Sequence, residues 1–223
     1  MPNNDECRIY VACLASYNNG RLHGAWIDCD GKDAAEISAE INAMLATSPY
    51  PNVIRRKCED CGAYFDISGE RGDISECPDC ESCNVSAKFD SAEEFAIHDS
   101  EGFYGIVKES TSIDDVASLS EILMGCDDDR RIGLLWLIDD VGYTIRDAIE
   151  KCDDVRAYSS NAFDILTDYA ESFVSDCYSE SELGVLSSYI DYSKLARDML
   201  LGGDIAEFDG PDGSVIITNA NEF

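Results

Sequence analysis

The first fifty residues have a hydrophobic pattern typical of two strands followed by a helix. Residues 8–15 (RIYVACLA) are mostly apolar and rich in β-formers, which predicts a buried strand. Residues 17–20 contain Asn-Gly, a strong hairpin signal, and residues 22–28 (LHGAWID) are the expected returning strand. From Asp33 to Ala46 the apolar residues recur at helical spacing, with Asp33 as the expected N-cap.

The rest of the chain is mainly helical in its pattern, apart from a cysteine-rich stretch and a C-terminal hairpin. Gly142 breaks the helical region, and Gly202-Gly203 ends the last helix. The expected elements are an apolar segment at 93–97, a loop at 98–103, short helices over 112–152, helices at 163–173 and 192–201, and a hairpin of 204–208 with 214–218.

These elements predict an α+β fold of three small domains. The first, residues 1–110, combines an antiparallel sheet with a helix and carries a cysteine-rich insert at about 52–90. The second, residues 111–157, is a helical and acidic unit. The third, residues 158–223, is a smaller α+β unit.

The insert has the cysteine spacing of a zinc ribbon. Cys58-x₂-Cys61 and Cys77-x₂-Cys80 are separated by fifteen residues and supply four thiolates for a closed tetrahedral zinc site. Cys83 is close enough in sequence to replace Cys77 or Cys80. A segment this short cannot bury a core of its own, so a structural metal would stabilise it. Reduced thiols in a loop are the alternative. A catalytic zinc site is disfavoured, because the insert contains no histidine.

The charge is extreme for a chain that can build a core. The sequence has 46 acidic and 16 basic residues, a net charge of −30, yet 45% of its residues are hydrophobic. A compact state with this charge repels itself, so we expect a strongly basic partner and neither nucleic acid nor membrane. Residues 91–223 hold most of the excess, at −22. A solvated surface adapted to high salt is the alternative.

Other motifs point away from secretion and from catalysis. The N-terminus lacks a signal-peptide pattern and no apolar stretch could span a membrane, so we expect a cytoplasmic protein. His98 could pair with Cys13 or Ser100, but no complete catalytic constellation is present and we expect no enzyme activity. The aromatic residues Tyr10, Trp26, Phe103 and Trp136 are expected to pack in the core.

Four segments stand out by their sequence and order: residues 9–28 (IYVACL, YNNG and LHGAWID), 95–103 (FAIHD and EGF), 168–171 (DYAE) and 189–204 (YIDY, LARDM and GD). Together, in this order, they resemble the ArdA antirestriction family. Two departures accompany the resemblance: the cysteine-rich insert lies outside the family's usual pattern, and residues 158–162 (YSSNA) lack an expected glycine.

The resemblance implies a DNA mimic that inhibits type I restriction–modification enzymes by occupying their DNA-binding groove. It also implies an elongated, curved chain of three domains that dimerises through its C-terminal domain, with Tyr189, Ile190 and Tyr192 as candidate contacts. A dimer would carry −60, the charge of about 100 Å of duplex at one charge per roughly 1.7 Å.

Carboxylates distributed over the surface would imitate the phosphates. The alternative function is an acidic zinc-ribbon adaptor or transcription regulator that binds a basic protein, and a hydrolase that uses His98 ranks last. The candidate mimic residues are Asp114, Asp115, Glu121, Asp127, Asp128, Asp129, Asp139, Asp140, Asp147, Glu150, Asp153, Asp154, Asp164, Asp168, Glu171 and Asp176.

Overall fold

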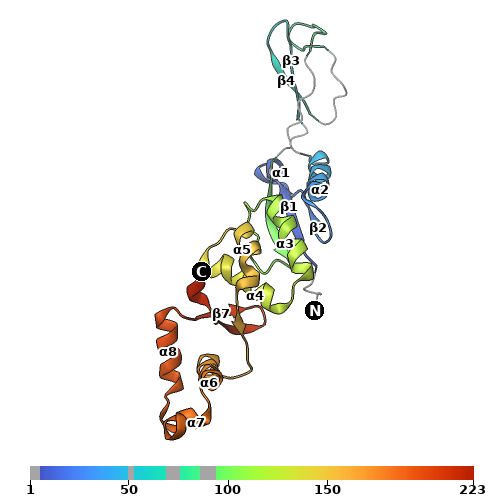
Figure 1. Ribbon diagram of the computed structural model, residues 1–223. Coiled ribbons are helices and arrows are strands. Elements are labelled where there is room, and N and C mark those ends of the chain that lie inside the picture. The colour runs from blue at the N-terminus through green and yellow to red at the C-terminus, as the bar shows by residue number, and fades with distance from the viewer. Residues whose placement is uncertain (1–5, 50–52, 69–75, 86–93) are drawn as a thin grey trace. The chain divides into compact units, whose positions relative to one another are not determined.

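The computed structural model describes residues 6–49, 53–68, 76–85 and 94–223, and the fold is mixed α and β as expected (Figure 1). The chain divides into two compact units, the N-terminal unit Met1–Met124 and the C-terminal unit Gly125–Phe223. The predicted division into three domains, residues 1–110, 111–157 and 158–223, stays a prediction. No helix among these residues is both long and apolar enough to cross a membrane.

The helices and strands alternate irregularly along the chain. In order they are β1 Arg8–Cys13, α1 Leu14–Asn18, β2 Gly24–Asp28, α2 Ala34–Ala46, β3 Val53–Lys57, β4 Tyr64–Ser68, β5 Phe95–Glu101, α3 Ile113–Gly125, α4 Asp128–Trp136, α5 Ile145–Lys151, β6 Ala157–Tyr158, α6 Ile165–Cys177, α7 Glu180–Leu183, α8 Tyr192–Gly202, β7 Ala206–Gly210 and β8 Gly213–Ile217.

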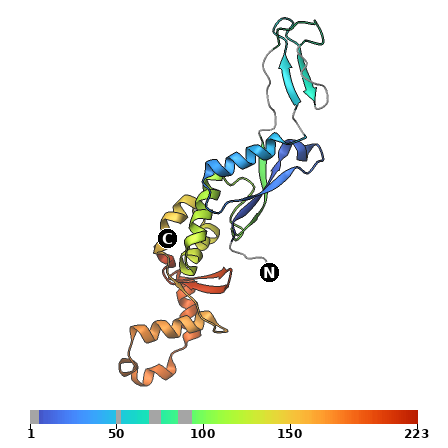
Figure 2. The ribbon, with the colours of Figure 1, turned by 90° about the vertical axis from the view of Figure 1, so that its right-hand side faces the viewer.

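The N-terminal unit is built on an antiparallel sheet with strand order β2-β1-β5. Helix α2 packs along β1 and β2 (Figure 2) and buries Ile37 and Ile41. Asp33 caps α2 as predicted, because its carboxylate accepts the Glu36 backbone N–H at 2.8 Å. Ser120 of α3 donates a hydrogen bond to Asp30, which ties α3 to the loop after β2.

The connection between β1 and β2 is longer than the sequence predicts. The strand ends at Cys13, and Leu14–Asn18 forms a short helix, so residues 17–20 are not a tight hairpin turn. The cause is tertiary, because the hydroxyl of Ser16 is buried against that of Ser48 at 2.6 Å. The predicted pairing of the two strands is nevertheless confirmed.

Strand β5 also corrects the sequence interpretation. Residues 98–101 were expected in a loop, but they continue β5 to Glu101 and pair with β1. A register shift between Tyr10 and Val11 accommodates the pairing. This part of the strand lacks alternating apolar residues, because His98, Asp99 and Glu101 are all polar and exposed on an edge strand of the sheet, and the sequence pattern therefore did not indicate it.

Two of the four expected core aromatic residues behave differently from the prediction. Phe103 and Trp136 are buried, but Trp26 is 40% exposed and Tyr10 is half-buried. Both rings lie on the solvent face of the sheet, 5.6 Å apart, while Ile27 takes the inward position beside Trp26. The Arg8 guanidinium lies 4.8 Å from the centre of the Trp26 ring.

The C-terminal unit contains a second antiparallel sheet, with order β6-β8-β7. Helix α6 packs against α8 and β8, and α4 packs against β7. Ile165, Ile205 and Ile216 form the buried cluster between them. The predicted C-terminal hairpin is confirmed, with its turn between Gly210 and Gly213.

Several helix boundaries in this unit differ from the predictions. The helix expected at 163–173 runs from Ile165 to Cys177, because Asp164 caps it and leaves Phe163 outside. Helix α4 continues into a π-helical turn that ends at Gly142, which has a φ of 85° and terminates it as predicted. The sequence missed β6, α7 and a 3₁₀ segment at Gly184–Tyr189.

Candidate metal centre and acidic surface

The two Cys-x₂-Cys segments form two matching turns. In the first, the Cys58 N–H donates to the Ala63 carbonyl at 2.9 Å, and the Gly62 N–H donates to the Cys58 carbonyl at 2.9 Å. The second turn repeats the pattern, with Cys77 bonded to Ser82 at 2.8 Å and to Glu81 at 2.9 Å. Each turn thereby aims its two sulfur atoms to the same side.

The matching turns require a left-handed residue at equivalent positions. Gly62 has a φ of 77°, and Glu81 has a φ of 57°. Glycine adopts this conformation freely, whereas a residue with a Cβ is strained there. The second turn therefore holds Glu81 against its intrinsic preference.

The turns bring the four predicted cysteine ligands together. The sulfur atoms of Cys58, Cys61, Cys77 and Cys80 all lie within 4.8 Å of one another. The Cys58–Cys80 and Cys61–Cys77 sulfur pairs are 3.5 and 3.6 Å apart. Four sulfurs around a tetrahedral zinc at about 2.3 Å would be about 3.8 Å apart, so the cluster is close to the size of a metal site.

Residues other than the cysteines also join the two turns, and the sequence analysis did not identify them. Asp60 accepts a hydrogen bond from Asn84 at 2.8 Å and another from the Ser82 hydroxyl. A bridge between Cys58 and Val85 adds a short antiparallel contact. The strands β3 and β4 pair from Val53–Ser68 to Lys57–Tyr64 and lead into the first turn. The only hint of this link in the sequence is that Asp60, Ser82 and Asn84 are polar residues close to the Cys-x₂-Cys pairs.

The thiols resist ionising together without a cation. The Cys61 backbone N–H donates to the Cys58 sulfur and lowers the pKa of that thiol to about 7. At Cys80 the Ser82 N–H favours the thiolate, but the nearby thiols of Cys61 and Cys58 outweigh it and raise the pKa to about 12. A bound metal ion removes this conflict, because it neutralises the repulsion between thiolates.

Cys83 does not belong to this group. It is exposed, and its sulfur lies 3.9 Å from a carboxylate oxygen of Glu76. The four sulfurs that converge are those of the two Cys-x₂-Cys pairs. The predicted choice of ligands therefore stands without a substitution by Cys83.

The candidate catalytic group around His98 is not assembled. The His98 ring packs edge-on against Tyr17 at 5.1 Å, and within the described residues it makes no hydrogen bond to Cys13 or Ser100. Cys13 is fully buried, and the Ser48 hydroxyl donates to its sulfur at 3.2 Å. Burial opposes ionisation of Cys13, but hydrogen bonds from Ser48 and Ser16 outweigh it and lower its pKa.

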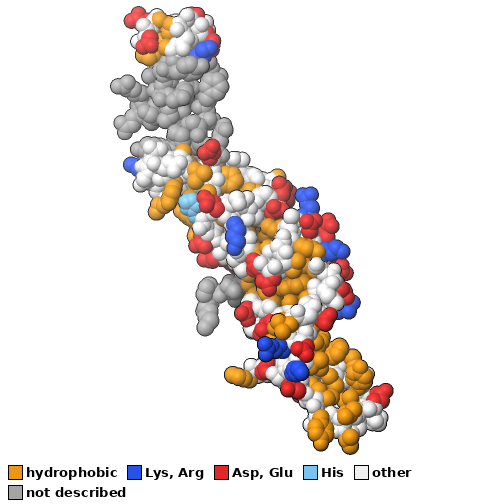
Figure 3. Space-filling view, turned by 90° about the vertical axis from the view of Figure 1, so that its left-hand side faces the viewer, with side chains coloured by type: hydrophobic (Ala, Val, Ile, Leu, Met, Phe, Trp, Pro, Cys, Tyr) orange, Lys and Arg blue, Asp and Glu red, His pale blue; other side chains and the backbone are white. Residues whose placement is uncertain are grey.

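The sixteen candidate mimic acids lie at the surface. All of them are exposed except Asp115 and Asp168, which are half-buried. Acidic side chains are spread over the face that Figure 3 shows and do not gather at one point. The two compact units share the charge equally at −15 each, since the N-terminal unit has 24 acidic and 9 basic residues and the C-terminal unit has 22 and 7.

Half of these acids already have a structural role. Asp127 and Asp164 cap helices, while Asp115 and Asp147 accept hydrogen bonds from the hydroxyls of Ser112 and Thr144. Asp168 accepts a hydrogen bond from the Tyr158 hydroxyl at 2.7 Å. Three more form ion pairs: Asp128 with Arg131, Asp153 with Arg130 and Asp154 with Lys151. Within the described residues, the others make no ion pair or side-chain hydrogen bond: Asp114, Glu121, Asp129, Asp139, Asp140, Glu150, Glu171 and Asp176.

Two of the unpaired acids are close enough to repel each other. Burial, and then the neighbouring carboxylates of Asp139 and Asp209, raise the pKa of Asp140. Neighbouring carboxylates without a cation between them are unfavourable in the free protein, and a basic partner would relieve their repulsion. We call the eight unpaired residues the free acids.

The candidate dimer contacts lie beside a larger apolar surface. Tyr189 is 83% exposed, while Ile190 and Tyr192 are half-buried. Val185 and Leu186 of the missed 3₁₀ segment are also exposed, with Tyr178 before them and Leu201 on α8. Figure 3 shows hydrophobic side chains gathered over this part of the C-terminal unit. The sequence signal for this surface is the apolar pair Val185-Leu186, which lies in a segment without helical periodicity and so has no predicted buried face.

Comparison with known families assigns the chain. No curated protein gives a match. The sequence model of the antirestriction protein (ArdA) family matches residues 9–211, which include the cysteine cluster, all sixteen candidate acids and most of the N-terminal unit, and which end before strand β8. Membership implies antirestriction function, a restriction–modification enzyme as partner, and an inhibitor in place of an enzyme. On this match, the chain belongs to the ArdA family of antirestriction proteins.

Proposed function

We propose that this chain inhibits type I restriction–modification enzymes by acting as a mimic of DNA in their DNA-binding groove. The observation that carries the proposal is the set of eight free acids, which are exposed and have no ion-pair partner among the residues that the structure describes. Acids that cap helices or pair with arginine are already satisfied. The free acids can interact with the basic groups that the enzyme otherwise directs at phosphates.

The charge of the chain supports the same mechanism. A net charge of −30 on a chain with a hydrophobic core costs stability through self-repulsion. Binding to a basic groove converts this cost into attraction and releases counterions from both surfaces. Inhibition should therefore weaken steeply as salt rises, as DNA binding does.

The test is ATP-dependent DNA cleavage by a purified type I enzyme, titrated with the full chain at several salt concentrations. We expect inhibition near stoichiometric amounts at low salt and a higher inhibitory concentration at high salt. Inhibition that is indifferent to salt would contradict mimicry of phosphates. An inactive chain across several type I enzymes would favour the adaptor function with a different basic partner.

We infer that the cysteine cluster holds a structural zinc ion. Four thiolates without an open position suit a structural site, and zinc prefers this tetrahedral geometry. The ion would stabilise the two turns, while the chemistry of inhibition would stay with the carboxylates. A reducing compartment, the cytoplasm, fits both these thiols and the proposed partner.

Metal analysis of the purified chain tests the identity of the ion. One zinc per chain is expected, and cobalt substitution should give the absorption bands of a tetrahedral thiolate site. Iron in the site would contradict zinc, since four thiolates also suit iron. A chain purified in zinc-containing medium that carries no metal would contradict the site itself.

We also propose that the chain forms a homodimer through the apolar surface of the C-terminal unit. A contiguous exposed apolar surface is unusual for a monomer. Tyr189, Val185 and Leu186 are each more than 60% exposed and would be covered by a second copy. A dimer would also present twice the acidic surface to one enzyme.

Light scattering of Leu186→Glu tests the dimer. We expect this variant to be a monomer, because the new charge would be buried in the interface. The matched control is Leu22→Glu, since Leu22 is 80% exposed in the N-terminal unit. A dimer that survives Leu186→Glu, or a wild-type chain that is a monomer at micromolar concentration, would contradict the proposal.

A further inference from the structure

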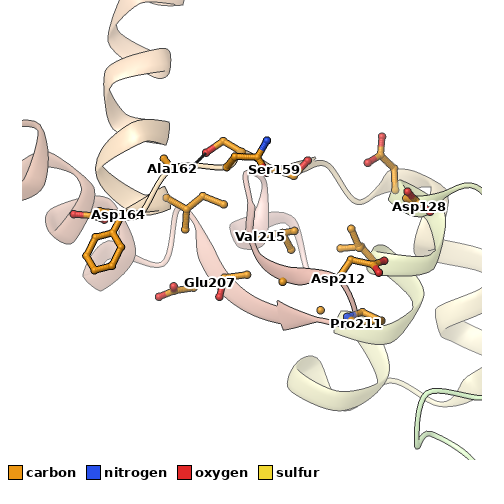
Figure 4. Close-up of a pocket in the computed structure, with 17 residues that line it drawn as sticks. Asp128, Ser159, Ala162, Asp164, Glu207, Pro211, Asp212 and Val215 are labelled. Carbon is orange, nitrogen blue, oxygen red and sulfur yellow. Dashed lines mark hydrogen bonds between the residues drawn. The ribbon is translucent and has the colours of Figure 1, made fainter. Parts of the chain in front are cut away.

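A hollow of about 720 Å³ opens in the C-terminal unit between α4, the loop before α6 and the β7–β8 hairpin. Its lining combines apolar side chains with five acidic ones. In Figure 4, Glu207 and Asp164 lie at the end near α6, Asp128 lies at the end near α4, and Val215 and Asp212 lie between them. No lysine or arginine is among the described residues that line the hollow.

The five acids of the hollow are not equally available. Asp164 is occupied with capping α6, since both of its oxygens accept from Thr167, at 3.1 and 2.7 Å. Asp128 and Asp212 hold the guanidinium of Arg131 at 2.8 and 2.9 Å. Asp129 and Glu207 are exposed, and among the described residues neither has an ion pair or a side-chain hydrogen bond.

Acids at the rim of the hollow already bind one guanidinium group, that of Arg131. One of its guanidinium nitrogens bridges α4 to the β7–β8 turn, and the side chain is only 17% exposed. Two carboxylates from separate elements thus already hold one guanidinium group at the rim. A second arginine, supplied by another protein, would meet the unpaired carboxylate of Glu207 at the end of the hollow near α6.

The apolar lining discriminates among cations. Ile132, Ile165 and Val215 offer a surface for the aliphatic stem of a long side chain. Phe163 lines the same hollow and is fully exposed, and among the described residues no ring contact involves it. A planar guanidinium stacks on an aromatic face and can form two parallel hydrogen bonds to one carboxylate, whereas an ammonium group cannot do both.

We propose that this hollow is a socket for an arginine side chain of the partner protein, with its stem on Ile132 and Val215 and its guanidinium between Phe163 and the carboxylate of Glu207. The inference rests on the proposed function, because it assigns one place on the acidic surface to one kind of group in the enzyme's DNA-binding groove. The free acids supply general attraction, and the socket supplies a fixed register.

The test measures binding of a tri-arginine peptide to the isotope-labelled full chain by NMR at low salt. We expect the largest shifts at residues of the hollow, and at least fivefold weaker binding of tri-lysine. Phe163→Ala and Glu207→Gln should each weaken tri-arginine binding about fivefold. The matched control is Glu171→Gln, which removes the same charge from a free acid outside the hollow and should change binding less than twofold.

Equal loss of affinity in Glu207→Gln and Glu171→Gln, or equal affinity for tri-lysine and tri-arginine, would overturn the socket. The cleavage assay separates this failure from failure of the function. A wild-type chain that inhibits the enzyme while the two variants bind the peptide equally leaves the DNA mimic standing without a socket. A chain that binds tri-arginine in the hollow but inhibits no type I enzyme leaves a socket for another arginine-bearing protein.

Discussion

The cysteine cluster and the acidic surface are two opposite ways of building a functional feature. The cluster depends on four side chains whose sulfur atoms lie within 4.8 Å of one another, so each is indispensable. The acidic surface spreads its charge over both compact units, at −15 each, so each acid is a small fraction of the whole. Local geometry makes the first feature fragile, and redundancy makes the second tolerant.

The largest expected effect of a single substitution is at the cluster. Cys58→Ser should abolish metal binding and disorder the two turns, because three thiolates leave the tetrahedral site incomplete. Inhibition of the type I enzyme should change less than twofold. Metal analysis and the cleavage assay measure the two outcomes, and Cys83→Ser is the control that should retain the metal. Loss of inhibition in Cys58→Ser would favour the adaptor function.

The next largest effect requires many substitutions at once. Changing all eight free acids to their amides should raise the inhibitory concentration about 200-fold, since each exposed charge contributes only about 0.4 kcal/mol. Any single change should cost about twofold. Cleavage titrations across the series test additivity. One substitution that abolishes inhibition would replace the distributed surface by a localised site.

A helix-capping acid should separate stability from inhibition. Asp164→Ala removes the cap of α6 and should lower the free energy of unfolding by about 1 kcal/mol. Inhibition below the unfolding transition should stay within about twofold, as for any one charge. Denaturant unfolding gives the first quantity. The matched variant Glu171→Gln lies on the same helix and should leave stability nearly unchanged.

Relief of strain in the second cysteine turn should produce a smaller, favourable change. Glu81→Gly places glycine where the first turn has Gly62, and should stabilise the metal-bound insert by about 0.5–1 kcal/mol. Competition with a chelator measures this gain. Gly62→Ala is the opposite change and should weaken metal retention. Weaker retention by Glu81→Gly would mean that the turn does not need a left-handed residue.

The smallest effects are those of pH on the structural acids. Hydrogen bonds from Thr167 lower the pKa of Asp164, and those from Ser160 and Tyr158 lower the pKa of Asp168. Their contribution is complete above the unfolded pKa, near 4, and is lost as pH falls through the depressed folded values. In Asp168→Asn, the free energy of unfolding should therefore fall less steeply as the pH is lowered below about 4. An unchanged slope would mean that these bonds do not form in solution.

The hairpin of the cysteine insert was invisible in the sequence, although its metal ligands were not. Four cysteines at this spacing predict their convergence because each Cys-x₂-Cys pair forms a local turn. Asp60 and Asn84 could not be foreseen as the link between the turns, since their contact joins residues 24 positions apart. The predicted helices at α2 and α8 were confirmed because capping signals and apolar spacing are local.

By itself, the sequence determined the α+β class, the four metal-binding candidates, the net charge and the family resemblance. Composition, spacing and order along the chain carry each of these directly. Only the tertiary structure decided which acids are free and which cap or pair, that Trp26 faces solvent, and that distant segments enclose an acid-rimmed hollow. Those properties depend on which side chains meet across long sequence separations, and packing sets those meetings after the local elements have formed.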